Sequence, residues 1–240
     1  MAYEQVLCNS VSLPKRIKYN QVDDSIIIGS NLLSTSYCDR IVAICEEHNE
    51  WENDDSAVYL QATYDLEVEK CPKLVDFLRA INLIEILNQY FELHYGMSIN
   101  SFDDVFVVKY QAYGEKSELV EHTDAGDLSF MIALTDRNMD FDGGGTYFRL
   151  LDSVLHLDKG DVVTFDAKLY HRGVSITRGT RYLLVGFCHM DRLQQLIEPE
   201  IPTTATATAT ATTMRSQGIP STRGARFPRG NLSTSLELLY

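Results

Sequence analysis

The chain has 240 residues, of which 45% are hydrophobic and 23% are charged, a composition typical of a globular protein with a sizeable core. The net charge of −13 is uneven: the segment from Pro202 onward holds four arginines and one glutamate, so Met1–Ile201 carries −16. An acidic body disfavours binding to duplex DNA, because phosphate groups need basic partners. The apolar runs are too short to cross a membrane.

The five cysteines are odd in number, widely spaced and without a CxxC pair. This pattern indicates neither a disulfide framework nor a zinc ribbon. The first residues also lack the basic and apolar stretches of a secretory signal. We therefore expect reduced thiols and a cytoplasmic or nuclear location.

Two helices are predicted in a supporting region at about residues 30–100. Ser34–His48 can begin with Ser34 or Thr35 as its N-cap, and its apolar residues fall on one face. Pro72–Tyr95 starts at a proline, stops before Gly96 and keeps helical spacing between its apolar residues. The pattern therefore predicts a single long helix over Pro72–Tyr95.

From about residue 101 to 192 the pattern changes to short β-branched or aromatic segments separated by glycine turns. The predicted strands are Val105–Tyr110, Leu128–Leu134, Thr146–Leu150, Asp161–Phe165 and Arg181–His189. Helices followed by many short strands predict a mainly β fold with flanking helices, α+β in class, such as a sandwich or jelly roll.

The composition changes near Pro199–Pro202, where the chain enters alternating threonine and alanine over Thr203–Thr213. This low-complexity tract offers no large side chains to bury. We expect residues 1–201 to form one domain and residues 202–240 to be a disordered tail.

His122-Thr123-Asp124 is a candidate metal-binding motif. Side chains two residues apart in an extended chain point to the same side, so the imidazole and the carboxylate would converge. His171 follows 47 residues after Asp124, which lets a later strand return beside the first. Two histidines and one carboxylate form the facial triad of iron(II) oxygenases, although such a pattern also arises by chance in a chain with six histidines.

Arg181 lies ten residues after His171 and opens an apolar strand. An arginine that points inward from such a strand needs an anionic partner. A dicarboxylate ligand held by the guanidinium fork would provide one. The structural alternative is an internal ion pair with Asp161 or Asp166.

The stretch Val107–His189 resembles the catalytic domain of iron(II)- and 2-oxoglutarate-dependent peptidyl hydroxylases, especially the procollagen lysyl hydroxylase and prolyl 4-hydroxylase branch. The matching segments are His122–Ala125, Leu128–Leu134, Gly143–Phe148, Gly160–Asp161 and His171–Phe187. The resemblance implies a distorted double-stranded β-helix, with iron held by His122, Asp124 and His171.

The same resemblance implies that Arg181 binds the C5 carboxylate of 2-oxoglutarate. Tyr110 matches a family tyrosine whose hydroxyl often helps to hold this cosubstrate, and Tyr113 is the alternative. Ser129 and Thr164 are further candidates for the cosubstrate pocket, or ordinary strand residues. The family commonly uses ascorbate to rescue over-oxidised iron.

The implied reaction uses O₂ and 2-oxoglutarate to hydroxylate an unactivated C–H bond and releases succinate and CO₂. Hydroxylation of a free small molecule or amino acid is the main alternative. An AlkB-like nucleic-acid demethylase is disfavoured, because that group has a second arginine where this chain has Phe187. A non-enzymatic binding module is disfavoured by the intact triad and Arg181.

The expected substrate is a peptide or protein, hydroxylated on lysine or proline. Prolyl hydroxylases of this group usually carry lysine at the position of Arg181, whereas lysyl hydroxylases carry arginine, so lysine comes first. Six acidic residues surround the triad and its glycine turn in the sequence: Glu118, Glu121, Asp127, Asp136, Asp140 and Asp142. An acidic rim would attract a cationic peptide.

Overall fold

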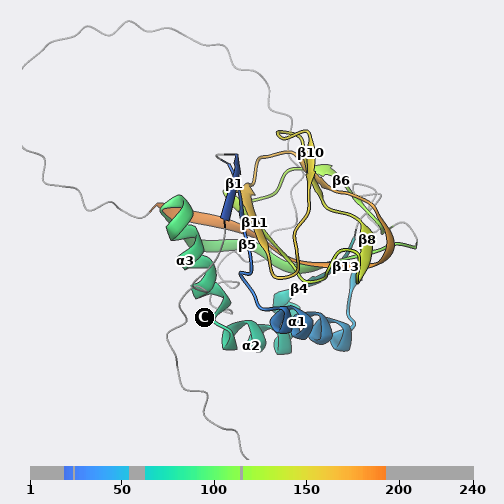
Figure 1. The fold of residues 1–240 in the computed structure, drawn as a ribbon. Coiled ribbons are helices and arrows are strands. Elements are labelled where there is room, and N and C mark those ends of the chain that lie inside the picture. Colours follow the sequence, from blue (N-terminus) through green and yellow to red (C-terminus); the bar gives the residue numbers. More distant parts are fainter. Residues whose placement is uncertain (1–18, 24, 54–62, 114–115, 193–240) are drawn as a thin grey trace, which may run out of the picture.

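The computed structural model describes residues 19–23, 25–53, 63–113 and 116–192 (Figure 1). Its helical elements are α1 (Thr35–His48), the 3-10 turn η1 (Val68–Lys70), α2 (Pro72–Ala80) and α3 (Leu83–Tyr95). Within these ranges, no helix is both long enough and apolar enough to span a bilayer. The predicted disordered tail lies outside the described residues.

Nine strands of the described chain form one large antiparallel sheet. They are β1 (Tyr19–Asp23), β2 (Ile26–Gly29), β3 (Glu52–Asn53), β4 (Tyr64–Glu67), β5 (Met97–Gln111), β7 (Leu128–Ala133), β8 (Phe141–Gly143), β11 (Val162–Asp166) and β13 (Ile176–Arg192). Their order is β1-β2-β11-β7-β13-β5-β4-β3, and β8 pairs with β13 off this path.

A second, smaller antiparallel sheet has the order β10-β9-β12-β6. Its strands are β6 (Leu119–His122), β9 (Thr146–Phe148), β10 (Ser153–Leu155) and β12 (His171–Gly173). Phe148 of this sheet packs edge-on against Phe165 of the large sheet, with ring centroids 5.0 Å apart. The two sheets therefore enclose an apolar layer between them.

The large sheet is covered on both faces, and alternation along its strands separates the two cores. In β7, Phe130 and Ile132 join the core formed with the helices, whereas Met131 and Ala133 join the core shared with the small sheet. Strands buried on both faces read as continuous apolar runs, which explains the sequence Leu-Ser-Phe-Met-Ile-Ala. The helices lie on one side of the sheets (Figure 1). The predicted mainly antiparallel fold braced by helices is confirmed.

Helix α1 forms where the sequence predicts it. The Ser34 hydroxyl accepts a hydrogen bond from the Tyr37 amide, as an N-cap does, and Asn49 ends the helix in a left-handed conformation. Cys38, Ile41 and Cys45 are buried on its inner face. Such burial contributes about 1.5–3 kcal/mol for each large apolar side chain.

The prediction of one helix over Pro72–Tyr95 is wrong, because two helices occupy this segment. The chain breaks at Asn82, which has φ +54°, and its amide donates to Arg79 O rather than continuing the α-helical ladder. Asparagine tolerates the left-handed region better than other non-glycine residues. The break lets both α2 and α3 bury apolar faces in one core, through residues such as Leu74, Leu78 and Leu87.

Candidate metal centre

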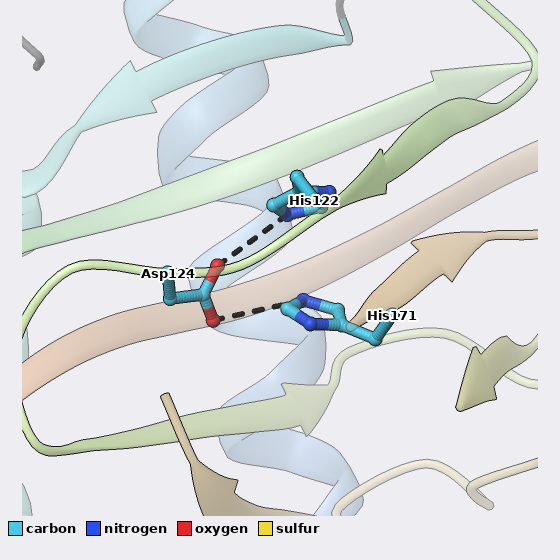
Figure 2. A group of neighbouring side chains, drawn as sticks. All are labelled: His122, Asp124 and His171. Carbon is cyan, nitrogen blue, oxygen red and sulfur yellow. Dashed lines mark ion pairs between the residues drawn. The ribbon is translucent and has the colours of Figure 1, made fainter. Parts of the chain in front are cut away.

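The two histidines of the predicted triad lie on neighbouring strands of the small sheet. His122 is the last residue of β6, His171 is the first of β12, and the two are directly paired in register. Residues paired in this way present their side chains on the same face. Asp124 follows two residues after β6, where the chain turns toward β7. Figure 2 shows both imidazoles directed at the Asp124 carboxylate.

The three side chains form a compact ligand set. His122 Nε2 lies 3.4 Å from Asp124 Oδ1, and His171 Nε2 lies 3.6 Å from Asp124 Oδ2. One ligand atom from each residue lies within 4.8 Å of the other two. Neighbouring ligands on a metal with bonds of about 2.1 Å are about 3 Å apart. The donor set and spacing therefore fit one metal ion.

Backbone carbonyls orient both imidazoles. His122 Nδ1 lies 2.8 Å from Val120 O, and His171 Nδ1 lies 3.0 Å from Leu169 O. A carbonyl can only accept, so in the neutral ring Nδ1 carries the proton and the Nε2 lone pair is free to bind a metal. Metal-binding histidines in proteins are commonly held in this way.

The protonation of the cluster follows from burial and mutual contact. Asp124 is 6% exposed; burial alone would raise the pKa of its carboxyl, but the two imidazoles and Ser129 lower it below its usual range. Burial opposes the charged form of His122, yet Asp124 raises the pKa of that imidazole. The pKa of His171 is lowered, chiefly by burial. These shifts favour a carboxylate at Asp124 and a neutral imidazole at His171, the forms that bind a metal.

Ser129 is predicted from the sequence to line the cosubstrate pocket. In the structure its hydroxyl is fully buried on β7 and donates to Asp124 Oδ2 at 2.6 Å. It therefore contacts a candidate metal ligand, and it helps to fix the carboxylate. The sequence holds no signal for this bond, since it depends on how the loop after β6 folds back over β7.

Arg181 lies on β13, facing the apolar layer between the two sheets. It is 5% exposed, and its guanidinium donates to Gly145 O at 3.0 Å and Thr146 Oγ1 at 3.4 Å, both neutral acceptors. Asp161 instead accepts from the Asn31 amide, and Asp166 from the Lys168 amide. Within the described part of the chain, no carboxylate forms an ion pair with Arg181, so the alternative of an internal ion pair is wrong.

Tyr110 lies beside Arg181, and Tyr113 does not. Tyr110 pairs in register with Arg181 across β5 and β13, and the guanidinium carbon lies 5.2 Å from its ring centroid. Burial raises the pKa of Tyr110 to about 12, partly offset by the charge of Arg181. Tyr113 is 85% exposed. Of the two tyrosines, only Tyr110 contacts the buried cation.

Of the two interpretations of Thr164, the structure supports an ordinary strand residue and not one that lines the pocket. Its hydroxyl lies 2.7 Å from Tyr95 Oη and also reaches Ile27 O, within the core that the helices cover. The neighbouring residues Val163 and Phe165 face the small sheet instead. Side-chain alternation along β11 therefore places Thr164 on the far face of the sheet.

Fold and site together define a class: a helix-braced antiparallel β protein with a candidate His-Asp-His metal site and a buried arginine that has no carboxylate partner among the described residues. The chain is 31% identical to procollagen-lysine,2-oxoglutarate 5-dioxygenase 1 of Bos taurus over 170 residues, which are 65% of this chain and 23% of the relative. The Drosophila melanogaster procollagen-lysine,2-oxoglutarate 5-dioxygenase is 27% identical, with the same shares covered.

These sequence matches confirm the resemblance to iron(II)/2-oxoglutarate dioxygenases of the lysyl hydroxylase branch. The chain spans about a quarter of the length of the curated relatives it matches. No family model matches the chain.

Solved structures share the fold at low sequence identity. A Pseudomonas putida prolyl-4-hydroxylase aligns over 70% of this chain and 94% of its own, with a TM-score of 0.51 and 16% identity. A Trichoplax adhaerens prolyl hydroxylase in complex with a hypoxia inducible factor peptide aligns over 70% and 85%, with a TM-score of 0.53 and 13% identity. The α-ketoglutarate-dependent epimerase SnoN aligns over 69% and 76%, with a TM-score of 0.54 and 14% identity.

Proposed function

We propose that this chain is an iron(II)- and 2-oxoglutarate-dependent dioxygenase that hydroxylates a peptidyl lysine or proline, with lysine the first residue to test. One observation carries the proposal: the triad of His122, Asp124 and His171 shares the layer between the sheets with Arg181, a buried cation that lacks an anionic partner among the described residues. We further propose that the two sheets form the double-stranded β-helix expected of this class.

The residues present fit a resident iron(II). His122 and His171 would bind through Nε2 and Asp124 through a carboxylate oxygen, a set that leaves coordination positions for other ligands. The bound metal would supply the activation of O₂ that is coupled to decarboxylation of 2-oxoglutarate. Ser129 would hold the Asp124 carboxylate in position for the metal, because its buried hydroxyl donates a hydrogen bond to Asp124 Oδ2.

Arg181 would bind the far carboxylate of 2-oxoglutarate. Two of its N–H groups already donate to Gly145 and Thr146, which fixes the plane of the guanidinium. A guanidinium retains further donors for a bidentate contact with a carboxylate. The surrounding inner face is apolar, with Met131, Ala133 and Leu183 buried in it, so water would be excluded from the cosubstrate.

A peptide substrate is supported by the curated relatives, which are named for procollagen lysine, and by the surface of the small sheet. Three exposed apolar side chains belong to this sheet or the residue next to it: Val120 on β6, Val154 on β10 and Tyr170 immediately before β12. Apolar groups exposed beside a site favour contact with a macromolecule over free solvent.

The acidic rim supports lysine less than the sequence suggests. Glu121 is paired with Arg149, and Asp142 with Arg178, so their charges are largely balanced locally. The preference for lysine over proline therefore rests chiefly on the relatives and on arginine at position 181.

The test has two stages. Anaerobic titration of the metal-free protein with iron(II) and then 2-oxoglutarate should produce a visible charge-transfer absorption band, and Arg181→Ala should require more 2-oxoglutarate to reach it. Matched Lys-, Pro- and Arg-centred peptides, together with free lysine and free proline, should then be assayed for succinate release and the mass gain of one oxygen atom. Absence of the band would overturn the cofactor assignment, and hydroxylation of free amino acids alone would overturn the peptidyl substrate.

A further inference from the structure

A second group of charged residues lies at the turn that carries Asp124. Thr123–Asp127 connects β6 to β7 and lies outside the strand ladders, yet it positions one of the three candidate metal ligands. We propose that Asp127, supported by His189 and Asp103, is a positioning residue that clamps this turn and so fixes Asp124 for metal binding. The inference rests on the proposed metal site.

The backbone of the turn is held against two neighbours. The Asp127 amide donates to Cys188 O at 2.8 Å, and the Ala167 amide donates to Asp127 O at 3.0 Å. The Asp124 amide in turn donates to Ala167 O at 2.8 Å. Ala167 therefore forms backbone hydrogen bonds with both Asp124 and Asp127. A displacement of Asp127 would thus also displace Asp124.

The fit of the turn against β13 is close. Gly126 has φ +71°, and a Cβ atom there would lie 2.6 Å from Cys188 O. Only glycine meets both demands without strain. The turn can approach β13 this closely because no side chain stands between them at Gly126.

The side chain of Asp127 holds the turn from the other side. Strand β7 pairs with β13 as far as Leu128 opposite Cys188, whereas β13 continues to Arg192 beside β5. At this open edge, Asp127 Oδ2 accepts a hydrogen bond from the Met190 amide at 3.0 Å. The Asp127 carboxylate thus accepts the hydrogen bond that a backbone carbonyl would accept if β7 extended further along β13.

His189 and Asp103 complete the clamp. His189 Nδ1 lies 3.6 Å from Asp127 Oδ2, and His189 Nε2 lies 3.0 Å from Asp103 Oδ2 on β5. One imidazole thereby links the turn to the β5–β13 pair. All three groups are partly exposed, so they contribute little to global stability. Their effect falls instead on the position of the turn.

Metal binding requires Asp124 to be held at a precise position. A metal site tolerates ligand displacements of only about 0.5 Å. Loss of groups that orient metal ligands typically weakens metal affinity by about 10–100-fold. Asp127→Ala removes both the Met190 hydrogen bond and the contact with His189, whereas Asp127→Asn keeps an acceptor for the Met190 amide.

The experiment compares Asp127→Ala, Asp127→Asn and the control Asp142→Ala. Asp142 is a matched control, because its side chain is similarly exposed and also pairs with a basic residue of β13. Its partner is Arg178, which lies eleven residues before His189. Cobalt(II) affinity is measured by calorimetry on metal-free protein. We expect a loss of about tenfold or more for Asp127→Ala, about threefold for Asp127→Asn and less than twofold for Asp142→Ala.

Hydrogen exchange of the Asp124 and Asp127 amides in metal-free protein provides an independent readout. Asp127→Ala should accelerate both amides, and Asp142→Ala neither. Parent-like cobalt affinity and exchange in Asp127→Ala, or an equal loss in the control, would overturn the clamp. A parent protein that binds no cobalt would overturn the proposed metal site, while exchange would still decide whether Asp127 holds the turn.

Discussion

The layer between the two sheets holds two buried charged groups with opposite surroundings. Asp124 contacts His122, His171 and Ser129, so the anion already has partners within the protein. Arg181 is equally buried, but its contacts are a carbonyl, a hydroxyl and the face of Tyr110. Two imidazoles that can release protons balance the charge of Asp124, whereas no carboxylate among the described residues balances the charge of Arg181.

This difference indicates what each region is built to bind. A buried carboxylate between two imidazoles can exchange protons for a metal cation at small cost, because its ligands are already in place. A buried guanidinium without an anion carries an unmet desolvation cost, which an anionic ligand would relieve. The same layer therefore favours a cation at one position and a carboxylate at the other.

The largest expected effect comes from the triad itself. His122→Ala, Asp124→Ala and His171→Ala should each abolish 2-oxoglutarate turnover in the absence of substrate, since a three-ligand site has no spare ligand. Succinate release from iron-loaded protein is the measurement, with circular dichroism to confirm folding. Full turnover in any one folded variant would show that the residue is not a ligand.

The second largest expected effect concerns Arg181, the buried cation of the comparison. Arg181→Ala should raise the apparent KM for 2-oxoglutarate by at least about tenfold, because loss of a charge-assisted contact costs roughly 2–5 kcal/mol. Cobalt(II) affinity should remain unchanged. Arg178→Ala, which removes an exposed arginine of the same strand, is the control. An unchanged KM would mean that Arg181 serves another ligand.

Stability without ligands should distinguish the two buried charges directly. Asp124→Ala removes the partner of two imidazoles and the acceptor of Ser129, so it should lower the free energy of unfolding by about 2 kcal/mol. Arg181→Met replaces an unbalanced charge with an apolar side chain, so it should leave that free energy unchanged or raise it by about 1 kcal/mol. Urea unfolding of metal-free protein measures both, and equal losses would contradict the comparison.

Asp104 on β5 extends the comparison to a carboxyl for which the described residues provide no ion-pair partner. Burial, with Glu67 and Asp65 nearby, raises its pKa from 3.8 to about 7. The folded state therefore retains a proton that the unfolded state releases, and stability falls as the pH rises from about 4 to 7.

Asp104→Asn removes this titration. The variant should be more stable than the parent by about 1–2 kcal/mol at pH 8, a figure reduced for partial exposure of the side chain. At pH 4 or below the advantage should disappear, because Asp104 is then protonated in the folded parent. Thermal unfolding at both pH values measures the difference, and an equal gain at both would assign it to packing.

Local patterns in the sequence were sufficient for several features. An N-cap at Ser34 or Thr35, the strands around Leu128 and Arg181, and the His122-Thr123-Asp124 motif all follow from side-chain chemistry over a few positions. The short strands β6 and β12, which bring His122 and His171 together, carry no such signal: they have four and three residues, and their pairing joins distant parts of the chain.

The sequence by itself identified His122, Asp124, His171 and Arg181 as candidates to bind iron and a dicarboxylate, because their side chains have the required chemistry and their spacing resembles that of a known family. Only the tertiary structure decided the rest. The separation of Ser129 from Thr164 and the lack of a carboxylate partner for Arg181 among the described residues depend on which face of a strand meets which sheet, and Tyr110 rather than Tyr113 contacts Arg181 because β5 ends before Tyr113. A shift of one residue in strand register reverses every side chain, and that register is set by long-range pairing and packing.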